Sequence, residues 1–146
     1  MEALEEVQER LAILEFTARY ADIADQKDWE ALTALFTPTA VFDAEGVYGR
    51  TYRGAGEILK FYQEAPAATG HHPTGVNTTF GSDGQARTRL KMLVLFGRAL
   101  FTCMYDLVLV KLEGNWRIDR LQLSVVGRTD IPRPSAAPSA SPAPPA

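Results

Sequence analysis

The sequence predicts an α+β fold in which three N-terminal helices pack on a strongly curved, mixed and mainly antiparallel sheet, forming a cone with an internal pocket. In the first part of the chain apolar residues recur with helical spacing, whereas after residue 65 the period becomes roughly two. The later segments are also richer in β-branched and aromatic residues. Helices followed by a run of strands indicate an α+β order, and the helices can cover the concave face of the sheet.

The first helix is predicted over about residues 4 to 24, directly before Asp25. Its apolar positions alternate spacings of four and three, with charged residues between them, and are Val7, Leu11, Leu14, Ala18 and Ala21. We expect this stripe to face the core. The next position of the stripe is Asp25.

Two shorter helices are expected to follow. Asp28 is the predicted N-cap of the second, which ends before Pro38 and whose apolar face comprises Trp29, Leu32, Leu35 and Phe36. Gly54 and Gly56 precede the third, which has Ile58, Leu59 and Phe61 or Tyr62 facing inward.

The remaining periodic segments are predicted strands. They cover residues 39–43, 47–52, 75–80, 86–96, 99–112 and 116–126. The apolar residues of the last segment change parity, which indicates a bulge near Asp119 or Arg120. Residues 64–75 contain two prolines and two glycines and are predicted to be a loop that covers a site.

Composition indicates one globular domain, residues 1–130, followed by a disordered Pro/Ala/Ser tail, residues 131–146. The net charge of -3 and the absence of a Lys/Arg-rich run argue against nucleic-acid or membrane-surface binding. The N-terminus does not resemble a leader and no apolar run is long enough to span a bilayer, so we expect a cytoplasmic protein. Cys103, the single cysteine, is expected to be a buried small hydrophobe.

Three aspartates lie close together near the predicted end of the first helix. Asp22 falls on a solvated face and Asp28 caps the next helix, whereas Asp25 continues the apolar stripe. A carboxylate turned inward needs a hydrogen-bond donor. The alternatives are that Asp25 points to water at a frayed helix end or caps the second helix. A calcium loop is disfavoured because no Gly turn or terminal Glu completes it.

The only two histidines, His71 and His72, can supply that donor. Asp25 would then fix the tautomer of the imidazole, so that the other ring nitrogen can take or give a proton. Adjacent residues at a strand entry point in opposite directions, so at most one of the two faces the pocket. The alternative for each is simple surface exposure.

Four motifs lie within residues 5–126: "ARYADIADQKDWEALTALFTPTAVFD", "YRG", "HHPTGVN" and "YDLVLVKLEGNWRI". Together they resemble the SnoaL-like branch of the nuclear-transport-factor-like superfamily, a cone-shaped α+β barrel family that includes polyketide cyclases and scytalone dehydratase. The resemblance implies acid-base chemistry on a small hydrophobic, aromatic or polyketide-like substrate, no cofactor or metal, and a homodimer formed through the outer sheet face. The Asp-His pair of the dehydratase matches Asp25 and His72, which favours His72 over His71.

Departures from the dehydratase pattern favour cyclisation or isomerisation over dehydration. Ala44 stands where that enzyme has a Tyr, Leu95 falls near its second catalytic His, and its polar Ser and Asn fall near Cys103 and Tyr105. We therefore predict a lyase or isomerase of secondary metabolism with Asp25 and His72 as catalytic residues. The predicted substrate-binding residues are Tyr20, Asp43, Tyr48, Tyr52, Asn77, Leu95 and Tyr105.

Two other functions stay open. The ketosteroid isomerase branch suggests a proton shuttle in which Tyr20 and a neutral Asp106 donate to an enolate while Asp43 moves the proton. The same fold is also used for non-catalytic binding of small ligands.

Overall fold

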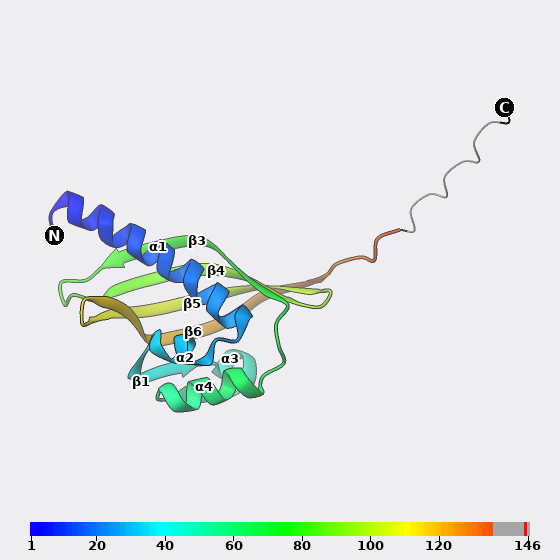
Figure 1. Ribbon diagram of the computed structural model, residues 1–146, viewed down its shortest axis with the longest axis horizontal. Coiled ribbons are helices and arrows are strands. Elements are labelled where there is room, and N and C mark those ends of the chain that lie inside the picture. Colours follow the sequence, from blue (N-terminus) through cyan, green and yellow to red (C-terminus); the bar gives the residue numbers. More distant parts are fainter. Residues whose placement is uncertain (136–144, 146) are drawn as a thin grey trace.

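The computed structural model describes residues 1–135 and 145 and confirms the α+β class (Figure 1). Most of the predicted tail, residues 136–144 and 146, lies outside the described residues. The helices are α1 (Ala3–Gln26), α2 (Trp29–Ala34), α3 (Glu45–Tyr48) and α4 (Ala55–Glu64). The strands are β1 (Phe36–Asp43), β2 (Thr51–Arg53), β3 (Gly70–Phe80), β4 (Ala86–Phe96), β5 (Ala99–Leu112) and β6 (Asn115–Asp130).

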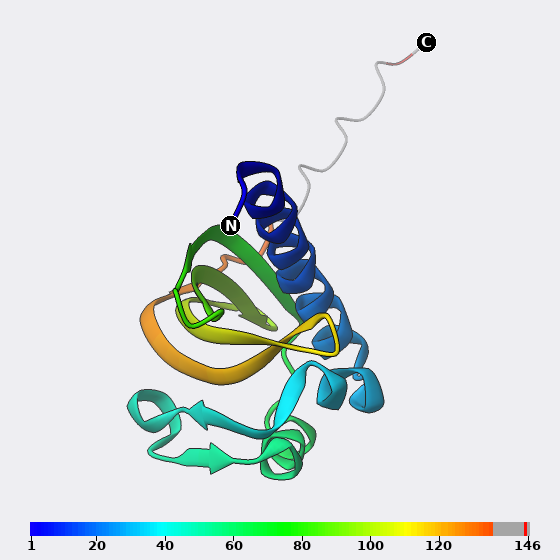
Figure 2. The same ribbon diagram turned by 90° about the vertical axis from the view of Figure 1, so that its left-hand side faces the viewer.

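The strands form one mixed sheet in the order β2-β1-β6-β5-β4-β3. Only the β1–β6 pair is parallel among the described pairs; the others are antiparallel. Figure 2 shows how strongly the sheet curves, with α1 along one side of the open curve. The predicted bulge is confirmed at Asp119, which lies between Arg120 paired with Val108 and Ile118 paired with Leu109.

The buried face of α1 differs from the predicted one, and Ala21 is the one residue of the predicted stripe that is buried. Val7, Leu11 and Leu14 are 53%, 56% and 46% exposed. The helix packs on the sheet through a second face with the same spacing, which comprises Ile13, Phe16, Thr17, Tyr20 and Ala21. This second face carries two aromatic rings and therefore buries more apolar surface than the Val/Leu stripe does.

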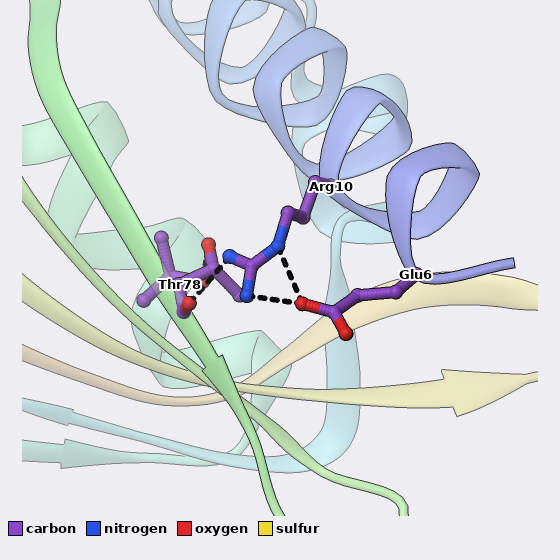
Figure 3. Close-up of polar contacts among 4 residues, drawn as sticks. Glu6, Arg10 and Thr78 are labelled. Atoms are coloured by element: carbon purple, nitrogen blue, oxygen red, sulfur yellow. Dashed lines mark hydrogen bonds and ion pairs between the residues drawn. The ribbon is translucent and has the colours of Figure 1, made fainter. Parts of the chain in front are cut away.

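Two polar contacts fasten α1 to β3, one of the two edge strands of the sheet. Near the start of the helix, Arg10 donates from Nη1 to the Thr78 carbonyl at 2.7 Å while Glu6 holds its guanidinium at 2.6 and 2.9 Å (Figure 3). Near the end of the helix, the Asp25 carboxylate accepts from the backbone N–H of His71 at 3.0 and 3.1 Å. An edge strand has unpaired backbone groups, and α1 supplies partners for two of them.

Two local predictions are wrong. Residues 70–75, expected to be loop, form the first half of β3, while residues 47–48 belong to α3 and not to a strand. The Asp43 side chain accepts from the backbone N–H of Glu45 at 3.2 Å, which favours a helical turn there, and Gly49 ends it with φ of 64°.

The core lies between the helices and the concave face of the sheet. Its largest fully buried side chains include Phe16, Phe42, Ile58, Leu109 and Leu121. Asp28 caps α2 as predicted by accepting from Ala31 N–H at 3.1 Å. Within the described part of the chain, no helix combines the length and apolar character needed to cross a bilayer.

Candidate active site

A cavity of about 560 Å³ opens between the helices and the concave face of the sheet. This volume lies within the usual range for small-molecule sites. Alternate residues of β4, β5 and β6 line one wall, and the segment 65–68 before β3 lines the mouth. The lining is largely apolar and includes Trp29, Phe42, Phe61, Val94, Phe96, Phe101, Cys103 and Leu123.

The polar feature of this cavity is a close pair between Asp25 and His71. Asp25 lies in the last turn of α1 and His71 is the second residue of β3. The His71 Nδ1 lies 2.6 Å from Asp25 Oδ1, and the two side chains are 13% and 28% exposed. His71 lines the cavity and Asp25 lies behind it. Asp25 as a whole residue is exposed, so it is not turned into the core as predicted, but its carboxylate has the imidazole partner that the sequence predicts.

The partner is His71 and not His72, so the expected pairing is wrong by one residue. The strand begins at Gly70, and side chains then alternate between the two faces of the sheet. His71 falls on the concave side, whereas His72 is exposed and does not line the cavity. Its Nε2 lies 3.0 Å from the position that a Cβ would take on Gly70.

The hydrogen bonding determines which nitrogen of His71 is free. Asp25 accepts from both the backbone N–H of His71 and its ring Nδ1, so the carboxylate fixes the ring from two directions. A proton on Nδ1 leaves Nε2 as the basic nitrogen. The arrangement can therefore accept a proton at Nε2 and return it.

Three buried tyrosines form a second polar group beside His71. The hydroxyls of Tyr20 and Tyr62 are hydrogen-bonded to each other, and the ring of Tyr20 packs edge-on against those of Tyr105 and His71 at centroid distances of 6.2 and 6.4 Å. Burial raises the pKa of all three hydroxyls above the ordinary phenol value. They therefore stay protonated in neutral solution and act as hydrogen-bond donors.

The predicted tyrosines divide into two groups. Tyr48 and Tyr105 line the cavity. Tyr20 lies behind the wall and reaches the cavity through Tyr62. Tyr52 lies outside the cavity and lines a neighbouring groove. Its ring packs against that of Phe61, with 4.7 Å between the ring centroids.

Three other predicted lining residues face away from the cavity. Asp43 follows the inward Phe42 and binds Arg120 at 2.8 Å on the opposite face. Asn77 is exposed and lines an outer groove. Leu95 alternates with Val94 and Phe96, which do line the cavity. The sequence does not show which residues of a strand face the cavity, and the alternation of side chains places these three on the outer face of the sheet.

Sequence reasoning missed several residues of the site. Tyr62 was expected only to pack inward, and Lys27 and Arg128 at the mouth were not expected there. The period-two positions of the long strands identify Cys103, Leu123 and Val125 as further wall residues beside the predicted Tyr105. No local signal identifies Lys27 or Arg128.

Within residues 1–135 and 145, no three His, Cys, Asp or Glu side chains gather closely enough to hold a metal ion. Burial raises the pKa of the Cys103 thiol, so this group in the cavity wall stays protonated in neutral solution.

Solved structures with the same fold span almost the whole chain. A putative scytalone dehydratase from Novosphingobium aromaticivorans DSM 12444 is 20% identical, with a TM-score of 0.72 over 93% of this chain and 96% of the other. The hexachlorocyclohexane dehydrochlorinase LinA-type3 from Novosphingobium barchaimii LL02 is 18% identical, with a TM-score of 0.75 over 94% and 99%. An NTF2-like protein with a cystatin-like fold from Novosphingobium aromaticivorans is 19% identical, with a TM-score of 0.71 over 84% and 85%.

At these identities the structures establish the fold alone, and no curated protein matches the chain. The sequence model of the SnoaL-like domain, in contrast, matches residues 5–122, which run from the first turn of α1 to the middle of β6. This match confirms the resemblance found in the motifs. The chain belongs to the SnoaL-like domain family.

Proposed function

We propose that the protein is a cofactor-independent acid-base enzyme, a cyclase, dehydratase or isomerase of a small hydrophobic, aromatic or polyketide-like molecule. The observation that carries this proposal is the Asp25–His71 pair in the wall of the apolar cavity. In this proposal His71 is the catalytic residue and Asp25 positions it, which replaces the assignment of His72.

The proposed reaction begins with proton abstraction next to a carbonyl group. Nε2 of His71 takes a proton from that carbon, and the electron pair of the C–H bond moves to the carbonyl oxygen. The resulting enolate can expel a leaving group that takes the proton from the imidazolium. It can also attack a second carbonyl to close a ring, with the new alkoxide oxygen taking that proton, or recover the proton at another carbon. Each route returns His71 to its neutral form.

The tyrosines supply the hydrogen bonds that an enolate oxygen needs. A single hydroxyl carries one proton, so the bond between Tyr20 and Tyr62 uses one of their two protons. Tyr62 and Tyr105 both line the cavity that contains His71. Donors already oriented in a site that excludes water stabilise developing negative charge more strongly than water does.

The ketosteroid isomerase scheme has no geometric support. Asp106 binds Arg89 at 2.7 Å and Asp43 binds Arg120 at 2.8 Å, both on the outer side of the sheet. Only Tyr20 of that scheme lies inside. Homodimerisation through the outer face stays a prediction, as does non-catalytic ligand binding.

The direct test is exchange of the methyl protons of 2-acetylnaphthalene in D₂O, followed by nuclear magnetic resonance. This neutral ketone has a carbonyl with adjacent C–H bonds and an apolar body suited to the cavity. We expect the wild type to accelerate exchange and His71→Ala to lower the rate by about 10²- to 10⁴-fold. His72→Ala, the matched control on the adjacent exposed residue, should keep the wild-type rate.

The affinity of each variant for the ketone is measured alongside. Equal exchange rates in the wild type and His71→Ala, with the ketone bound by both, would contradict the enzyme proposal and favour the binding module.

A further inference from the structure

We infer that the substrate carries a negative charge, such as a carboxylate, which Lys27 holds at the cavity mouth while the apolar body reaches His71. This inference rests on the proposed function because it takes the cavity as the substrate site. It concerns Lys27 and Arg128, the two formally charged side chains among the described lining residues.

The charge at the mouth is one-sided. No Asp or Glu occurs among the residues that line the described cavity, although the chain has an excess of acidic groups overall. Arg128 donates to Asp130 from Nε at 3.2 Å and from Nη2 at 3.1 Å, so its guanidinium already has a carboxylate partner. Lys27 forms no ion pair with the described residues, which leaves its ammonium group available to a ligand.

The backbone of Lys27 gives a second, independent reason. This residue ends α1 in the left-handed region, with φ of 56° and ψ of 37°, and its N–H donates to the Ala24 carbonyl at 3.2 Å. Glycine or asparagine is the favoured residue at such a helix end, because a larger side chain is strained there. Strained backbone at a site is often retained for a functional reason.

The same turn fixes the relation of Lys27 to the catalytic pair. Asp25 and Lys27 lie two residues apart, and the helix end directs the carboxylate to His71 and places the lysine at the mouth. A ligand anchored at Lys27 would therefore extend inward along Trp29 toward His71. Binding energy from a remote charged group can orient the reacting part of a substrate.

The test compares 2-naphthoate with 2-naphthamide, two probes of nearly equal shape that differ in charge, by calorimetric titration. We expect the wild type to bind the acid about fivefold more tightly than the amide, the effect of one partly exposed ion pair. Lys27→Gln should reduce this preference to below about twofold and leave the amide affinity unchanged. Lys91→Gln, on an exposed residue of the outer sheet face, should keep the full preference.

Lys27→Gly separates binding from folding. Glycine relieves the left-handed strain, so this variant should unfold at a temperature no lower than the wild type and still lose the acid preference. Ala99→Trp, which fills part of the cavity, should weaken the binding of both probes.

Equal affinity of the wild type for acid and amide, or an unchanged preference in Lys27→Gln and Lys27→Gly, would overturn the inference. So would failure of both probes to bind. Exchange of the neutral ketone does not depend on Lys27, so exchange without any acid preference would reject the anionic substrate and leave the proposed function intact.

Discussion

At the scale of single residues, the proposed chemistry depends on which of two adjacent histidines faces inward. The sequence predicts an Asp-His pair, because Asp25 continues a stripe of apolar positions and needs a donor. It does not predict His71 over His72, because that choice depends on whether β3 begins at Gly70 or after Gly75. The prolines and glycines of residues 64–75 favour a loop, so the sequence does not indicate that a strand begins at Gly70.

Tyr62→Phe tests the tyrosine group. The change removes the hydroxyl that is bonded to Tyr20, so we expect ketone exchange to slow by about tenfold or more, with affinity changed by less than about twofold. We also expect the free energy of unfolding to fall by about 1 kcal/mol. Exchange rates and calorimetric affinity provide the measurements.

Tyr52→Phe is the matched control because the Tyr52 side chain lies outside the cavity. A Tyr62→Phe protein with the wild-type exchange rate would show that the hydroxyl takes no part in stabilising the enolate.

At the scale of secondary-structure elements, α1 shows how a correct helix can be given the wrong face. Its ends were predicted within two residues, because the spacing and the Asp28 cap mark them. Its buried face was not predicted, because the helix has two apolar faces with the same spacing. Packing on the sheet determines which of the two is buried. Asp25 still reaches His71 because it follows the buried Ala21 by one helical turn.

A pair of substitutions tests this corrected face. Ile13 is fully buried, so Ile13→Ala should lower the free energy of unfolding by about 2–4 kcal/mol through lost burial and a cavity. Leu11 is 56% exposed, so Leu11→Gln should change it by no more than about 0.5 kcal/mol. Urea denaturation of both variants measures the difference. The reverse ranking would indicate that the Val/Leu stripe faces the core.

At the scale of the whole molecule, Glu9 connects elements that are far apart in the sequence. It lies on α1, pairs with Lys111 at the end of β5 and accepts from Trp116 Nε1 on β6 at 2.7 Å. The hydrogen bond from Lys111 is the largest factor that lowers the pKa of Glu9 from its ordinary value of 4.5. The folded state therefore holds this carboxylate in its ionised form more strongly than the unfolded chain does.

The pH dependence of stability follows from that shift. A carboxylate with a lowered pKa stabilises the fold above pH 4.5, and this contribution is lost as the pH falls through the pKa of the folded state. We expect Glu9→Gln to be less stable than the wild type at neutral pH and to lose less stability on acidification below pH 4.5. Denaturant titrations across that range measure both slopes, and parallel slopes would contradict the assignment.

The order of elements and the class of sheet followed from periodicity and from the resemblance, and the bulge at Asp119 from a change of parity. The residues of the cavity wall could not be predicted in this way, because they depend on which residues of strands far apart in the sequence share the concave face. For that reason the prediction placed Asp43, Asn77 and Leu95 in the cavity wall, where they do not lie. Tyr62 lines the cavity and is hydrogen-bonded to Tyr20, a contact that the sequence alone does not indicate.

The tautomer of His71 decides whether the Asp25–His71 pair can work as proposed, and the ring nitrogen resonances of ¹⁵N-labelled protein measure it. The chain has two histidines, so His72→Ala assigns both rings. In the neutral imidazole of His71 we expect a proton on Nδ1, bonded to Asp25, and an unprotonated Nε2 facing the cavity. A His71 ring protonated on Nε2, with Nδ1 bare, would contradict this expectation.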